Sequence, residues 1–175
     1  MVYQDPVRDV EDSSLLFGQN RDTYVWNGED TGYEIYHAAI DWGGPVGTSI
    51  YAVDEGFVTF AGWNSNTGYT VIIQHDLPYD LQVYSVYAHL GTGMMLQNEA
   101  IYVKDQDPVK KDTQIGIMGT SKGAKNDPGQ GMSPHLHFEV RTLLNINETA
   151  SFPLYNRAYW INQPYTPNNC NPWTQ

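Results

Sequence analysis

Short hydrophobic segments separated by turn-forming residues run through the middle of this 175-residue chain. The segments are rich in β-branched and aromatic residues, which is typical of strands. Gly, Asn, Asp and Pro lie between them, as in the turn Asp54-Glu55-Gly56. The pattern predicts an all-β fold, a single antiparallel β-sheet domain, with strands at 50–53, 57–62, 69–75, 81–90, 101–103, 114–118 and 136–142.

The two ends of the chain lack this regularity. Residues 1–16 carry several acidic residues without a period, so we expect an extended lead-in. Residues 17–142 are then the folded domain, and the proline-rich residues 143–175 are an irregular tail packed on it. Within the domain, Trp26-Asn27-Gly28 is a turn signal with aromatic residues on both sides. Residues 120–134 hold several glycines and prolines and predict a loop before the last strand.

Composition excludes several classes of partner. Twenty acidic residues against nine basic ones give a net charge of −11, which argues against nucleic acid, because phosphate binding needs clustered Lys and Arg. No window approaches the ~20 apolar residues of a membrane span, and no leader opens the chain. Cys170 is the only cysteine, so the fold contains no internal disulfide. The oligomeric state stays open.

Histidines give the chain its chemistry. His135 and His137 flank one apolar residue in a predicted strand, so their side chains point to the same face. His37 and Asp41 lie four residues apart in a segment that Gly43 stops, too short for a helix, and we expect a turn running into a strand. Imidazole is the commonest protein metal ligand and the usual general base near neutral pH. These residues are therefore candidates for a hydrolytic zinc site.

The number of ligands separates a catalytic from a structural zinc site. Catalytic zinc takes three protein ligands and keeps one position for water, whereas four ligands close the shell. A zinc ion bound by all four candidates, His37, Asp41, His135 and His137, would be structural. In an enzyme, one histidine of the pair must therefore stay off the metal. The residues alone do not decide which one.

A series of short motifs, in order along the chain, resembles the lysostaphin/LytM-type zinc metallopeptidases, which cleave peptide bonds in bacterial peptidoglycan. Each motif alone is a weak signal, but their order and spacing together are specific. The matching stretch runs from about residue 17 to residue 141, most of the chain, and includes 37–42, 45–52, 56–62, 71–75, 87–90, 115–119 and 135–141. The resemblance implies an antiparallel sheet, related to the barrel-sandwich hybrid, with a groove walled by loops.

The same resemblance implies the roles of individual residues. One zinc per chain would be held by His37, Asp41 and His137. His89, which ends a predicted strand in Tyr87-Ala88-His89-Leu90, and His135 would stand beside the metal-bound water and act in catalysis. The implied substrate is peptidoglycan peptide, and the implied location is extracytoplasmic: secreted, in the cell wall or in the periplasm.

The chain departs from the family at two places. The family usually has glycine where Ala39 stands, and alanine would be strained there if the position needs a positive φ. Segments 91–107 and 120–134 look longer than usual. We expect them to build groove walls, so the resemblance does not name the bond that is cleaved.

Other readings of the same residues stay open. A non-catalytic regulator or wall-binding module of this fold usually loses ligands, and this chain keeps them all. A small β carrier module would need an attachment lysine or a phosphorylated histidine, and it does not explain Asp41. We expect His75 to be structural, and Glu139 to face solvent or pair with Arg141 rather than orient a histidine. Core packing is the default for three aromatic residues, Tyr33, Trp42 and Trp63.

Overall fold

The computed structural model describes residues 6, 13–15, 20–26, 29–37, 39–78, 81–122, 126 and 132–141. Their regular elements are eleven strands and one short helix. In chain order they are β1 Ser13–Leu15, β2 Asn20–Trp26, β3 Glu29–Tyr36, β4 Ile40–Gly43, β5 Ser49–Tyr51, β6 Gly56–Asn64, β7 Gly68–Leu77, β8 Leu81–Leu90, α1 Gln97–Ala100, β9 Pro108–Val109, β10 Gln114–Ile117 and β11 His135–Arg141.

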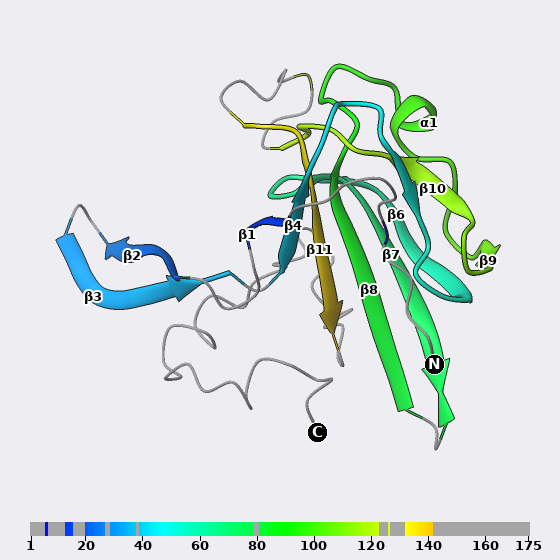
Figure 1. Ribbon diagram of the computed structural model, residues 1–175, viewed down its shortest axis with the longest axis horizontal. Coiled ribbons are helices and arrows are strands. Elements are labelled where there is room, and N and C mark those ends of the chain that lie inside the picture. The colour runs from blue at the N-terminus through cyan, green and yellow to red at the C-terminus, as the bar shows by residue number, and fades with distance from the viewer. Residues whose placement is uncertain are drawn as a thin grey trace.

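The main sheet has seven strands in the order β1-β4-β11-β8-β7-β6-β9, and every pairing in it is antiparallel. Two further antiparallel ribbons are formed by β10 with β5 and by β2 with β3. Figure 1 shows β4, β11, β8 and β7 side by side, with α1 and β10 at the same end of the molecule. The predicted all-β antiparallel fold is confirmed.

The two faces of the main sheet bury different sets of side chains. Successive side chains of a strand point to opposite faces. On one face, Val71, Ile73 and Tyr87 pack with Leu136 and Phe138, and residues of the β5–β10 ribbon join the same core. The other face carries a smaller apolar cluster of Ile72, Tyr84 and Val86. The large core therefore holds β7, β8 and β11 together and leaves the opposite face for other chemistry.

The strand predictions hold at most places, and β8 has the predicted bounds. The predicted strand 101–103 is wrong, because Ile101 makes only an isolated bridge to Gly116. A turn follows, in which the backbone N–H of Lys104 donates to the Asp107 carboxylate, and a strand pairs with β6 only at Pro108–Val109. The lead-in contributes β1, which pairs with β4, and the expected tail lies outside the described residues.

The structure tests the expected core packing of Trp42 and Trp63 and the expected structural role of His75. Trp42 and Trp63 are partly buried against the main core, as expected, whereas the side chain of Tyr33 is outside the described part. His75 is structural: its Nδ1–H donates to the Glu55 carbonyl at 2.7 Å, and its Nε2 accepts from the Ser85 hydroxyl at 2.7 Å. Burial lowers the pKa of His75, so the ring is neutral in the folded protein.

This burial predicts a pH dependence of stability. The unfolded chain takes up a proton at His75 near pH ~6.5, whereas the folded ring resists protonation, so stability should fall as the pH drops below ~6.5. His75→Gln should be less stable at neutral pH but should lose less stability between pH ~7 and ~5. Urea unfolding at several pH values, with a chelator present to remove metal effects, measures the free energy of unfolding of both proteins. An identical change of the unfolding free energy with pH in both proteins would contradict the prediction.

Candidate metal centre

The register between β4 and β11 brings two predicted ligands together. Asp41 in β4 pairs directly with His137 in β11, and His137 pairs on its other side with Ala88 in β8. Cross-strand partners share a face of the sheet. Because Leu136 and Phe138 belong to the main core, His137 and Asp41 lie on the opposite face. The predicted strand at Asp41 is confirmed as β4, whereas His37 directly follows β3 and the predicted turn lies partly outside the described residues.

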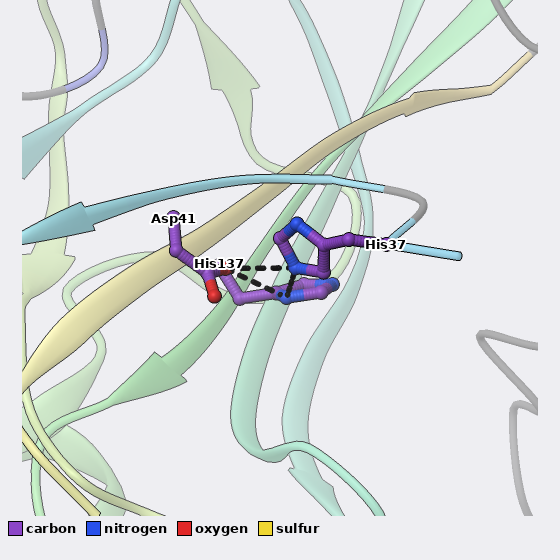
Figure 2. Close-up of side chains that lie close together, drawn as sticks. All are labelled: His37, Asp41 and His137. Carbon is purple, nitrogen blue, oxygen red and sulfur yellow. Dashed lines mark hydrogen bonds and ion pairs between the residues drawn. The ribbon is translucent and has the colours of Figure 1, made fainter. Parts of the chain in front are cut away.

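Three donor atoms converge at this point (Figure 2). His37 Nε2 lies 3.2 Å from Asp41 Oδ1 and 3.3 Å from His137 Nδ1. His137 Nδ1 lies 3.0 Å from the same Asp41 oxygen. All three side chains are buried. Residues a hundred positions apart in the sequence thus form one compact group that could hold a metal ion.

The spacing and chemistry of these donors fit zinc. Metal–ligand bonds of about 2.0–2.2 Å in a tetrahedral site place neighbouring donors roughly 3.3 Å apart. The three observed separations, 3.0 to 3.3 Å, are close to that edge length. Two imidazoles and one carboxylate also form a donor set known from catalytic zinc sites.

Electrostatics hold the group together without metal. Burial opposes ionisation of Asp41, but hydrogen bonds from His137 and His37 keep the pKa of its carboxyl far below the ordinary value. Burial also opposes charge on His137, but hydrogen bonds to Asp41 and Glu139 raise the pKa of its ring to about 9. The metal-free site therefore keeps a proton on His137, next to the Asp41 carboxylate. A bound cation would take the place of that proton.

Glu139 contacts His137 from the side away from Asp41. Its Oε1 accepts from His137 Nε2 at 2.9 Å, and its Oε2 accepts from Arg141 Nε. Burial raises the pKa of Glu139, but the charge of Arg141 and the contacts with His137 outweigh it, so the pKa is lowered. The expected ion pair with Arg141 is confirmed, whereas exposure to solvent is wrong, because Glu139 is 3% exposed. The contact with His137, which the sequence favoured less than solvent exposure or the ion pair, is present.

Two further histidines, His89 and His135, stand beside this group. His135 Nε2 lies 3.7 Å from Asp41 Oδ2, and the His89 ring centroid lies 4.9 Å from that of His135 and 5.6 Å from that of His137. Burial and the neighbouring His137 and His135 lower the pKa of His89 to about 3. Within the described residues, the metal-binding group contains His37, Asp41 and His137 but neither of these two. All five predicted site residues are thus brought together.

The structure tests the departure at Ala39, and part of the segment 120–134 lies outside the described residues. Ala39 is buried, and in the described part of the chain the positive-φ residues other than glycine are His89, Gln106, Asp112 and Asn126. Alanine is therefore not strained at position 39. Residues 123–125 and 127–131 of the expected wall loop lie outside the described residues.

Comparison with known proteins identifies the family. The model of peptidase family M23 matches residues 35–153, about two thirds of the chain and all five residues of the site. This chain belongs to peptidase family M23. The matched range begins just before His37 and includes the β4–β11–β8 region that carries the metal-binding group.

Relatives of this M23 chain are similar over the same part. The DD-carboxypeptidase/endopeptidase Mpg of Neisseria meningitidis is 30% identical over 105 residues, 60% of this chain and 20% of Mpg. The peptidoglycan DD-endopeptidase ShyC of Vibrio cholerae is 31% identical over 109 residues, 62% of this chain and 21% of ShyC. The chain spans about a fifth of the length of these curated relatives.

Solved structures share the fold. The crystal structure of a zinc-containing peptidase from Vibrio cholerae superposes with a TM-score of 0.56 and 22% identity, over 78% of this chain and 35% of that chain.

The contact of Glu139 with His137 generates a prediction about metal affinity. Glu139→Ala should weaken zinc binding by about 10- to 100-fold, because His137 loses the acceptor that keeps Nδ1 turned toward Asp41. Glu139→Gln keeps an acceptor oxygen and should lose less zinc affinity. Competition with a chelating indicator measures the affinity, and circular dichroism checks the fold. Wild-type affinity in a folded Glu139→Ala protein would refute the role.

Proposed function

We propose that this chain is a zinc-dependent endopeptidase that hydrolyses peptide bonds in the cross-links of bacterial peptidoglycan. The observation that carries the proposal is the convergence of two imidazole nitrogens and one carboxylate oxygen at 3.0 to 3.3 Å, with two more histidines beside them. Membership of peptidase family M23 and the names of the relatives Mpg and ShyC support the reaction class and the substrate.

In this proposal His37, Asp41 and His137 hold one zinc ion through Nε2, Oδ1 and Nδ1. Bound zinc supplies a water of pKa near ~7 and polarises the scissile carbonyl. The side chain of Glu139 keeps His137 in the tautomer that turns Nδ1 toward the other two ligands.

His89 and His135 are the proposed catalytic residues. Each donates its Nδ1–H to a backbone carbonyl, His89 to Ser121 at 2.9 Å and His135 to Ser133 at 2.8 Å. A neutral ring whose proton is on Nδ1 keeps a lone pair on Nε2. That lone pair is what a general base needs to take a proton from water. One of the two rings would later return a proton to the leaving amine.

The substrate places the proposed site of action outside the cytoplasm, in the wall, the periplasm or the medium. In the described part of the chain, no helix has the length and hydropathy to cross a bilayer. The net charge of −11 makes general attraction to anionic wall polymers a poor docking force, so recognition would rest on specific contacts near the site.

Digestion of purified peptidoglycan tests the function directly. The zinc-loaded protein should release fragments with new amino termini inside the peptide cross-links, and mass spectrometry identifies them. A chelator should abolish the release, and added zinc should restore it. A folded, zinc-loaded protein that yields no new termini from walls of several cross-link types would refute the proposal.

Alanine substitutions separate ligands from catalytic residues. Replacing His37, Asp41 or His137 should lower zinc occupancy from about one per chain, the content of a single three-ligand site. His89→Ala and His135→Ala should keep zinc but lose turnover by roughly 10²- to 10⁴-fold. Metal analysis and rates are measured on the same samples, with His75→Gln as a control histidine outside the site. Loss of zinc in His135→Ala but not in His137→Ala would mean that their roles are exchanged.

A further inference from the structure

His89 faces the metal centre only because β8 is irregular there. Tyr87 packs in the main core, and Ala88 pairs with His137 on the opposite face. Regular alternation would return His89 to the core face and send Leu90 to the face of the site. Instead Leu90 belongs to the main core, and the His89 ring lies beside those of His135 and His137.

A β-bulge causes this change of face. Along β7 and β8, Tyr69 pairs with Leu90 and Val71 pairs with Tyr87, so two residues of β8 lie opposite Thr70 alone. His89 has a φ of +62°, in the left-handed region. A bulge adds one residue to a strand and re-aims the side chain there. The left-handed conformation is unfavourable for a residue with a side chain, so surrounding contacts must hold it.

Ser121 contacts both strands at one end of the bulge. Its Oγ donates to the Leu90 carbonyl at 2.5 Å and accepts from the Tyr69 N–H at 2.9 Å. Its backbone N–H donates to the Gly91 carbonyl at 3.0 Å. The side chain is fully buried, and a Cβ added at Gly68 would lie 2.2 Å from the Ser121 carbonyl oxygen. Ser121 therefore has little freedom to move.

The carbonyl of Ser121 faces the His89 ring. His89 Nδ1 lies 2.9 Å from this oxygen, and a carbonyl oxygen can only accept a hydrogen bond. The ring therefore carries its proton on Nδ1 and its lone pair on Nε2. We propose that Ser121 is a positioning residue that fixes both the tautomer and the direction of the His89 ring at the metal centre. The consequence for catalysis rests on the function proposed above, whereas the tautomer does not.

The first test reads the tautomer in the wild-type protein. Two-dimensional ¹⁵N NMR of histidine rings distinguishes a protonated Nδ1 from a protonated Nε2, and His89→Gln identifies the His89 signals by their loss. We expect the His89 ring to carry its proton on Nδ1, where the Ser121 carbonyl accepts it, and none on Nε2. A proton on Nε2, or an equal mixture of tautomers, would overturn the proposal. This reading needs no substrate and no substitution at Ser121.

The second test removes the serine hydroxyl. Ser121→Ala should lower kcat by about tenfold or more, part of the usual worth of a positioned acid or base, with KM and zinc content unchanged. The His89 spectrum should then show a mixture of tautomers. Unchanged kcat together with a single Nδ1–H tautomer would overturn the positioning role.

Ser85→Ala is the matched control. It also removes a buried serine hydroxyl, in this case one that bonds the His75 ring, and Ser85 lies on the same strand as His89 but outside the site. It should leave kcat and the His89 spectrum unchanged, and an effect equal to that of Ser121→Ala would overturn the proposal. If Ser121→Ala does not fold, the wild-type spectrum decides. If the wild-type protein has the expected tautomer but cleaves no peptidoglycan, the proposed function fails and the assignment of the tautomer stands.

Discussion

The pairing of β4 with β11 is the constraint on which the site depends. It sets Asp41 opposite His137, and through β11 it also fixes His135 and Glu139 on the same face. A slip of one residue would turn His137 into the core and bring Leu136 out to face Asp41. The core contacts of Leu136 and Phe138 prevent such a slip, because they bury apolar area only in the observed register. Packing on one face thus specifies chemistry on the other.

Charges alternate along a line of contacts through the sheet. Arg141 contacts Glu139, Glu139 contacts His137, and His137 contacts Asp41, so each ionised group has a neighbour of opposite sign. A buried charge without such a neighbour would be costly. The line ends at Asp41, which His37 Nε2 also contacts at 3.2 Å. A divalent cation bound there would replace the proton of His137 and would keep a positive charge beside the Asp41 carboxylate.

The sequence predicts those features that depend on local pattern. Tyr87 and its neighbours mark β8 by their β-branched and aromatic side chains, and the i, i+2 spacing places His135 and His137 on one face. Features that depend on distant contacts are not predictable in this way. His89 at the bulge contacts Ser121, 32 positions away, and the burial of Glu139 depends on what covers that face. The four-residue helix α1 is too short to show a period.

The place of β11 in the sheet also has a consequence for the order of assembly. It is the last described strand in the chain, yet it lies between β4 and β8, so β1 and β4 join the rest of the main sheet only through it. During synthesis the N-terminal strands must wait, unpaired with this sheet, until about residue 141 has left the ribosome. Such long-range pairing slows folding. It also means that His137 can join His37 and Asp41 only after β11 has been made, so a chain that lacks β11 has no assembled site to load.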